Sequence, residues 1–150
     1  MRRRKRVKKR REFLKNLLAV GTGVSLPKLV RASALGLEGV VVPSDRVVVG
    51  GIGIGHRGTY LLGCFLNEPD VQYAAVCDIR ASRRAAAKAR VDRKYGNRDC
   101  TPYRDFRKLL ERKDIDAVMI ATGPNWHTTA SVYAAKAGKN IYCEKPCTKN

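Results

Sequence analysis

Short apolar segments alternate with amphipathic segments from residue 46 to the end of the chain. The apolar segments are rich in Val, Ile and Ala, and they occupy residues 46–52, 71–77, 116–122 and 140–143. Runs that are apolar on both faces are typical of strands buried in a parallel sheet. Apolar residues spaced three and four apart predict helices over residues 57–66, 81–95, 105–112 and 126–137.

Capping residues support the ends of two of these helices. Asp105 is placed to act as the N-cap of the helix over 105–112, and Gly138 follows the helix over 126–137 in the C′ position. The Gly-Pro-Asn sequence at residues 123–125 predicts a turn, and Tyr103 ends a short strand or connection. Strands that alternate with helices predict an α/β fold, a Rossmann-type doubly wound parallel sheet.

A glycine-rich turn, Gly-Ile-Gly-His-Arg-Gly, follows the first predicted strand at residues 53–58. Gly53 would allow the tight turn, Gly55 would admit a pyrophosphate to the backbone, and Gly58 would let the next helix pack closely. His56 and Arg57 lie where that helix begins, and its free N–H groups would face the phosphates. The setting between a strand and a helix favours dinucleotide binding over an ordinary tight turn.

The end of the second predicted strand bears on the choice of cofactor. Asp78 stands there, and a carboxylate at this position would accept hydrogen bonds from the adenosine ribose, which favours NAD. Arg80, Arg83 and Arg84 follow at once, and an arginine such as Arg83 could pair with the 2′-phosphate of NADP. The arginines favour NADP or dual use, and the solvated face of a helix is the alternative explanation for them. The cofactor is therefore NAD or NADP.

Four segments follow predicted strands and carry polar or glycine residues. They are the glycine turn, Asp78, residues 122–127 and residues 144–146. Ligands of open parallel sheets bind beyond the carboxyl ends of the strands, where these four segments would meet. We therefore expect one composite site.

The sequence resembles the Gfo/Idh/MocA family, the glucose–fructose oxidoreductase and inositol dehydrogenase type. The resemblance spans about residues 46–150 and rests on motifs that occur in the family's order. These are VGGIGIGHRGT at 49–59, VCD at 76–78, YRDFRKLL at 103–110, DIDAVMIAT at 114–122, WH at 126–127, AKAGK at 135–139 and EKP at 144–146.

The resemblance implies an NAD(P)-dependent oxidoreductase that transfers hydride to or from a hydroxyl carbon of a sugar- or polyol-like substrate. It implies that Thr122, Trp126 and His127 lie along the cofactor near the nicotinamide. Packing is the alternative role for Trp126, and capping or packing of a helix is the alternative for His127. Glu144 and Lys145 belong to the E-K-P motif, and Lys145 would act catalytically by assisting proton movement at the substrate hydroxyl. Many members have Thr-Pro at the end of the fourth strand; here Thr122, Gly123 and Pro124 stand there, so the loop geometry differs from the family pattern.

The family also implies a second, mostly antiparallel domain that holds the substrate. The 150 residues end shortly after the E-K-P motif, so we expect the sheet to be incomplete at its C-terminus and the substrate domain to be absent. The chain alone would then be inactive. A truncated, non-catalytic nucleotide-binding remnant or a regulatory module is the alternative, and assembly into a homo-oligomer is left open.

The net charge of +18 is concentrated near the N-terminus. Residues 1–34 contain 12 Lys/Arg and one acid, whereas residues 35–150 contain 19 Lys/Arg and 12 acids. The Arg-Arg-Glu-Phe-Leu-Lys sequence at 10–15 resembles the twin-arginine export signal, and Ala-Ser-Ala at 32–34 matches a cleavage site.

These features predict three segments: a twin-arginine signal peptide over 1–34, a linker over 35–45 and an NAD(P)-binding domain over 46–150. The protein would be exported to the periplasm by the twin-arginine machinery, with a cytoplasmic location as the alternative. A basic tail that binds nucleic acid is the competing explanation of the leader. Most of the basic excess lies in a leader that we expect to be removed, so we expect no specific nucleic-acid partner.

The five cysteines include no C-x-x-C pair and no Cys/His set with zinc spacing, so no metal site is expected. Cys77 and Cys143 fall within predicted strands, where a cysteine behaves as a small buried hydrophobic residue. Cys143 and Cys147 flank residues 144–146, and a reactive thiol near the site is the less favoured alternative.

Overall fold

The computed structural model describes residues 43–147 of the chain. A short 3₁₀ turn, η3 (Pro43–Asp45), precedes the first strand. Strands and helices then alternate as the sequence predicted. They are β1 (Val47–Ile52), α2 (His56–Phe65), β2 (Val71–Cys77), α3 (Ala81–Tyr95), β3 (Thr101–Tyr103), α4 (Phe106–Leu110), β4 (Ala117–Ile120), α5 (Pro124–Lys136) and β5 (Asn140–Cys143).

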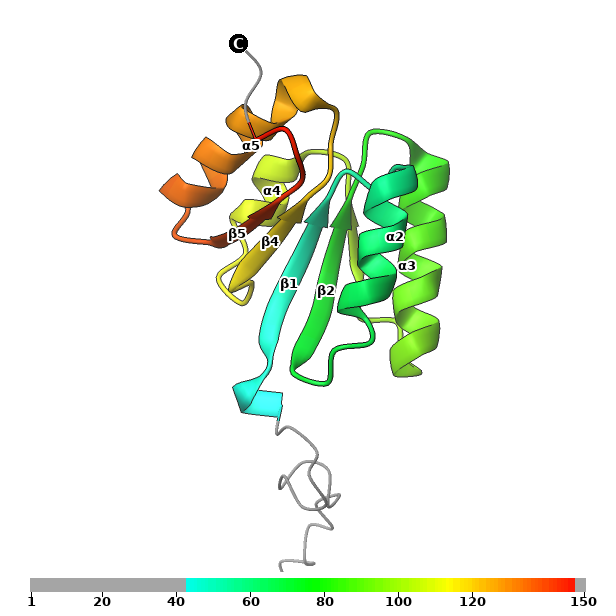
Figure 1. The fold of residues 1–150 in the computed structure, drawn as a ribbon. Coiled ribbons are helices and arrows are strands. Elements are labelled where there is room, and N and C mark those ends of the chain that lie inside the picture. Colours follow the sequence, from blue (N-terminus) through cyan, green and yellow to red (C-terminus); the bar gives the residue numbers. More distant parts are fainter. Residues whose placement is uncertain (1–42, 148–150) are drawn as a thin grey trace, which may run out of the picture. The chain divides into compact units, whose positions relative to one another are not determined.

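The five strands form one parallel sheet in the order β3-β2-β1-β4-β5 (Figure 1). Its central strand, β1, pairs Ile52 with Cys77 of β2 and with Ile120 of β4. The chain first builds outwards from β1 to β3 and then crosses to β4, so the order reverses between β1 and β4. Such a switch point opens a crevice beyond the carboxyl ends of the strands.

Helices cover both faces of the sheet. α2 and α3 lie on one face, and α4 and α5 lie on the other (Figure 1). The buried side chains of the strands divide in the same way: Val49, Tyr73 and Met119 pack towards α2 and α3. Ile52, Ile120 and Val118 pack towards α4 and α5. This confirms the doubly wound Rossmann-type arrangement that the sequence predicted.

Side chains from the two layers approach the backbone of β1 closely. The hydroxyl of Tyr73 lies where any Cβ at Gly51 would be, and the position of a Cβ at Gly50 is 2.8 Å from Cδ2 of Leu109. The Tyr73 hydroxyl is fully buried and has no hydrogen-bond partner within residues 43–147. A buried polar atom of this kind is uncommon and costs stability.

The start of α5 differs from the prediction. The helix begins at Pro124, with Gly123 as its N-cap, so residues 123–125 do not form a separate turn. Proline suits the first position of a helix because its φ is already helical and its missing N–H is not needed there. Asp105 does cap α4, since its side chain accepts a hydrogen bond from the backbone N–H of Arg107. Gly138 has φ 69° and ends α5 as predicted.

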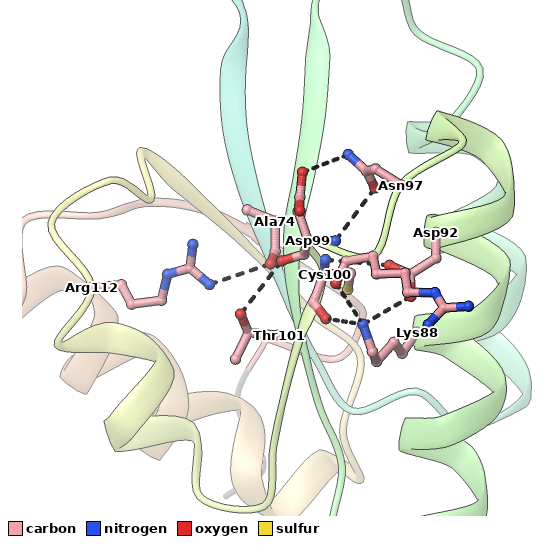
Figure 2. Close-up of polar contacts among 9 residues, drawn as sticks. Ala74, Lys88, Asp92, Asn97, Asp99, Cys100, Thr101 and Arg112 are labelled. Carbon is pink, nitrogen blue, oxygen red and sulfur yellow. Dashed lines mark hydrogen bonds and ion pairs between the residues drawn. The ribbon is translucent and has the colours of Figure 1, made fainter.

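A network centred on Lys88 holds the connection from α3 to β3 (Figure 2). The Lys88 ammonium donates to the carboxylate of Asp92 at 2.8 Å and to the carbonyls of Arg98 at 3.0 Å and Cys100 at 2.7 Å. Asp92 also accepts from the backbone N–H of Cys100 at 3.3 Å. These bonds fix β3 beside β2, and β3 in turn places the residues that follow it at the crevice.

The outer strand β5 has only β4 as a neighbour within residues 43–147. Asn140, Ile141 and Tyr142 are exposed on it, whereas β4 is buried from Val118 to Ile120. Among the residues that the structure describes, none of the helices is both long and apolar enough to cross a membrane.

Candidate functional site

A cavity of about 750 Å³ opens at the carboxyl ends of the strands. Segments that follow β1, β2, β3 and β4 line it, as expected for a composite site at one sheet edge. The predicted site residues in its wall are Gly53, Gly55, His56, Arg57, Asp78, Arg83, Thr122 and Trp126. The remaining four, Gly58, His127, Glu144 and Lys145, lie outside this wall.

The glycine turn closes tightly against the loop after β4. Gly53 has φ 86°, in the left-handed region, and a Cβ there would lie 2.7 Å from the backbone nitrogen of Thr122. Gly58 is buried in α2, and a Cβ on it would overlap the carbonyl oxygen of Gly53. Gly58 therefore lets the helix approach the turn and has no contact of its own with the cavity.

The N-terminus of α2 faces the cavity without a capping side chain. Gly55 is the N-cap, none of the described side chains bonds to the free N–H groups, and the first turn contains no acid. A Cβ on Gly55 would meet only the guanidinium of Arg83, at 3.4 Å, so the turn is open on the cavity side. An uncapped helix N-terminus next to an open glycine turn fits the pyrophosphate of a dinucleotide.

Asp78 is 7% exposed and its carboxylate organises the backbone around it. Oδ2 accepts from the backbone N–H of Ile54 at 2.8 Å, and Oδ1 accepts from that of Arg80 at 2.8 Å. A guanidinium nitrogen of Arg83 is 3.8 Å from Oδ2. The carboxylate that the sequence assigned to the ribose therefore also ties the glycine turn to the start of α3.

The three arginines after β2 have different places. Arg83 lines the cavity beside Asp78, whereas Arg84 donates to the carbonyls of Asp78 at 2.7 Å and Ile79 at 3.1 Å. Arg84 thus stabilises the loop between β2 and α3. Of the three, Arg80 bonds through its backbone and only Arg83 has its side chain in the cavity wall.

Residues after β3 also line the cavity, and the sequence interpretation missed them. They are Arg104, Asp105, Phe106 and Arg107. Arg107 lies over the rings of Phe106 at 5.0 Å and Tyr133 at 5.5 Å. The sequence left the segment ending at Tyr103 open as a short strand or a connection. The rule that ligands bind at the carboxyl ends of parallel strands includes these residues once that segment is known to be a strand. Ile79, which is 79% exposed at the rim, was missed as well.

Glu144 and Lys145 of the E-K-P motif line a second cavity of about 650 Å³, together with Arg57, Tyr142 and Cys143. Oε1 of Glu144 accepts from Nε of Arg57 at 2.9 Å and pairs with its Nη2 at 2.8 Å. The hydrogen bond from the Arg57 guanidinium is the main reason why the pKa of Glu144 lies below its usual range. Arg57 lines both cavities and so joins them.

His127 is 2% exposed and connects two loops. Its Nδ1 is 2.7 Å from the carbonyl oxygen of Pro146, and its Nε2 is 3.0 Å from that of Thr122. A neutral imidazole donates from one nitrogen only, and an imidazolium donates from both. His127 is not part of the wall of the 750 Å³ cavity, and its burial fits the packing role that the sequence left open beside a role along the cofactor.

Trp126, the only tryptophan of the chain, lies on the first turn of α5 and is 54% exposed at the cavity rim. Its indole is therefore available to a ligand.

Cys77 is buried, and burial raises the pKa of its thiol to about 12. Cys143 is only half-buried, so the expectation of a buried residue is met by Cys77 alone. Residues 43–147 contain no group of His, Cys, Asp or Glu side chains that could hold a metal ion.

A doubly wound parallel sheet with a glycine turn and a free helix N-terminus at its switch point defines a dinucleotide-binding Rossmann domain. The sequence profile of the Gfo/Idh/MocA oxidoreductases, described as an oxidoreductase family with an NAD-binding Rossmann fold, matches residues 46–150. The chain belongs to this family.

Known relatives agree with this assignment. A protein named glycosyl hydrolase family 109 protein from Saccharopolyspora erythraea is 35% identical, over 91% of this chain and 33% of its own length. A probable dehydrogenase from Thermotoga maritima has TM-score 0.61 and 30% identity over 69% of this chain and 29% of its own. A 3-ketoreductase from Actinomadura kijaniata, solved with TDP-benzene and NADP, has TM-score 0.58 and 28% identity over 69% and 30%. The chain spans about a third of the length of the curated relatives it matches.

Proposed function

We propose that this chain is the NAD(P)-binding part of an exported oxidoreductase that moves hydride to or from a hydroxyl carbon of a sugar- or polyol-like substrate. The observation that supports it most is the arrangement of the cavity. The open turn at Gly55 and the free N-terminus of α2 face the same space as Asp78 and Thr122. A dinucleotide needs these features together: a phosphate site at one helix and a ribose acceptor at the next strand.

Each part of the cavity has a role in this proposal. The turn from Gly53 to Gly58 holds the pyrophosphate, with His56 and Arg57 beside it, and Asp78 accepts from the adenosine ribose. The cofactor, when bound, accepts or supplies the hydride. Thr122 and Trp126 border the nicotinamide side. Lys145 is exposed on the adjoining second cavity, and its amine takes the proton of the substrate hydroxyl on oxidation, while its ammonium returns that proton on reduction.

Cofactor choice depends in this proposal on the pair formed by Asp78 and Arg83. Asp78 shares its charge with two backbone N–H groups and with Arg83, which reduces its repulsion of a 2′-phosphate. Arg83 itself is within reach to pair with that phosphate. We therefore propose that the site accepts NADP as well as NAD, as the ketoreductase solved with NADP also suggests.

The relatives support a carbohydrate substrate. One has a name that describes a glycosyl hydrolase, and another was solved as a ketoreductase with a TDP ligand. A second candidate function follows from the first of these names. Transient oxidation of a sugar hydroxyl by a bound dinucleotide can accompany glycoside cleavage, and NAD-dependent glycosidases are known. A cofactor regenerated within each cycle would also suit an exported protein.

Export is proposed from the sequence alone, because residues 1–34 lie outside the described part of the chain. The twin-arginine route carries folded proteins, and a Rossmann domain loaded with nucleotide is such a cargo. N-terminal sequencing of the exported protein should begin at Leu35. An intact Met1 on all of the protein would reject cleavage and favour the cytoplasmic alternative.

The single tryptophan provides the test of cofactor binding. Trp126 emission overlaps with the absorption of reduced nicotinamide, so bound NADH should quench Trp126 and emit in its place. ADP-ribose, which lacks nicotinamide, should abolish this transfer by competition. Arg83→Ala should weaken NADPH more than NADH, while Arg93→Ala, an exposed arginine on the same helix, should leave both unchanged. The absence of saturable quenching in the wild-type chain would reject the proposed function, including its carbohydrate chemistry, and favour a remnant without nucleotide binding.

A further inference from the structure

The turn that carries Lys145 is held on its N-terminal side by an ion pair. The backbone N–H of Lys145 donates to Oε2 of Glu144 at 3.3 Å. The other oxygen of the same carboxylate is occupied by Arg57, at 2.8 and 2.9 Å, from the first turn of α2. Glu144 is 9% exposed, so this carboxylate is largely shielded from water. The helix that begins at the phosphate site thus fixes the backbone of Lys145.

The same turn is held on its C-terminal side by His127. Pro146 follows Lys145, and its carbonyl oxygen is 2.7 Å from Nδ1 of His127. The other ring nitrogen, at 3.0 Å from the carbonyl of Thr122, fixes the ring to the loop after β4. His127 lines neither of the two cavities, so these two carbonyls are its polar contacts among the described residues.

The side chain of Lys145 has no such support. It is exposed, and within residues 43–147 its ammonium has no hydrogen bond or ion pair. Where the ammonium can reach is therefore decided by the backbone of the turn. Both anchors of that backbone, Arg57 and Thr122, are also part of the cofactor cavity wall.

We propose that His127 and the Arg57–Glu144 pair are positioning residues that hold the Lys145 turn against the nicotinamide end of the cofactor cavity. This inference rests on the proposed function of Lys145. His127 acts through Pro146 and Thr122, and the pair acts through the N–H of Lys145. The arrangement couples the two cavities: a pyrophosphate at α2 meets the same Arg57 that fixes Glu144, so cofactor binding is transmitted to the lysine.

Two substitutions at His127 separate its contacts. The amide nitrogen of Asn occupies the place of Nδ1, so His127→Asn keeps a donor for Pro146. The amide nitrogen of Gln occupies the place of Nε2, so His127→Gln presents a donor to the carbonyl of Thr122 and none to that of Pro146. Thr128→Val is the matched control, because Thr128 is the next residue of α5 and its hydroxyl makes only a long contact of 3.5 Å with the carbonyl of Cys147.

Two measurements follow on each variant of the full chain. The first is hydrogen exchange of the Lys145 amide in protein labelled with ¹⁵N-lysine. The second is the ratio of the dissociation constants of NADH and ADP, because ADP fills the adenine half of the site alone. The loss of one hydrogen bond predicts about tenfold faster exchange and about a tenfold rise of the ratio in His127→Gln. His127→Asn should change both by much less, and Thr128→Val should change neither.

Arg57→Met tests the positioning of the Lys145 turn independently of His127. Arg57 is an exposed side chain, so this variant is expected to fold, and the loss of its pair with Glu144 should speed exchange of the Lys145 amide. Unchanged exchange in both His127→Gln and Arg57→Met would overturn the positioning role. Equal effects of Asn and Gln at position 127 would also overturn it. If the wild-type chain binds no NADH, the proposed function fails, and the exchange rates still decide whether the turn is held as described.

Discussion

Oδ2 of Asp78 lies 2.8 Å from the backbone nitrogen of Ile54, and this N–H donates to it from inside the glycine turn. The carboxylate at the end of β2 therefore shapes the phosphate loop at the end of β1. Ribose recognition and loop geometry depend on one side chain, so changes at Asp78 should affect stability as well as nucleotide binding.

Asp78→Ala should lower the free energy of unfolding by about 2 kcal/mol, because the buried N–H of Ile54 and the part-buried N–H of Arg80 lose their acceptor. It should also weaken ADP and NADH alike. The control is Asp116→Ala: Asp116 also accepts from β1, from the N–H of Val48 at 2.8 Å, but it is exposed and water can replace it. Denaturant unfolding of the two variants checks the difference. Equal losses of stability would show that Asp78 does not organise the turn.

Gly55→Ala and Gly58→Ala should affect different properties, the first nucleotide binding and the second stability. The new Cβ at position 55 meets only the flexible Arg83 side chain, so this variant should keep its stability and lose pyrophosphate binding. The new Cβ at position 58 overlaps the carbonyl of Gly53, so this variant should lose about 2 kcal/mol of stability or more. Thermal unfolding and Trp126 quenching by NADH measure the two properties separately. Full NADH affinity in a folded Gly55→Ala would place the phosphate elsewhere.

Tyr73→Phe should raise the free energy of unfolding by about 1 kcal/mol, because it removes a buried hydroxyl that lacks a partner. Burial also raises the pKa of this phenol, so its hydroxyl stays neutral throughout the ordinary pH range. Tyr95→Phe is the opposing control, since the Tyr95 hydroxyl accepts from the backbone N–H of Tyr73 at 2.9 Å. The second change should destabilise the protein. A loss of stability in Tyr73→Phe would mean that its hydroxyl has a partner in solution.

The ion pair between Glu144 and Arg57 should make the stability of the protein depend on pH in the acid range. Its pKa is held below the usual value of about 4.3 by Arg57, so the stability that the ionised carboxylate contributes is fully present above that value. This stability is lost as the pH falls through the lowered folded pKa. A ¹³C NMR titration of Glu144 in the wild type and in Arg57→Met checks it. The same titration curve in both proteins would remove Arg57 as the cause.

The alternation of strands and helices could be predicted because apolar periodicity reflects burial on a two-sided sheet. The helix over Ala81–Tyr95 was predicted with the bounds that the structure shows. The start of α5 could not be placed as well, since Gly123 and Pro124 are equally good in a turn and at a helix N-terminus.

The glycine turn, Asp78 and Thr122 could be assigned to one cavity because sheet topology brings the ends of β1, β2 and β4 together, whereas Glu144 and Lys145 line a second cavity. The contacts of His127 could not be predicted, because two backbone carbonyls are its partners and any sequence supplies such carbonyls. The same holds for Asp78, whose bonds with Ile54 and Arg80 depend on the path of the backbone. The segment ending at Tyr103 was left open as a short strand or a connection because β3 has only three residues, so the cavity residues Phe106 and Arg107 after it were not assigned to the site.

The outer edge of β5 has a consequence for the protein in solution. Ile141 and Tyr142 are exposed on a strand whose far side carries backbone donors and acceptors spaced for another strand. Within residues 43–147 this edge is unpaired, so a further strand, from the same protein or from another copy, can add to the sheet there. Ile141→Lys would discourage pairing with another copy, because charged side chains protect strand edges against edge-to-edge association.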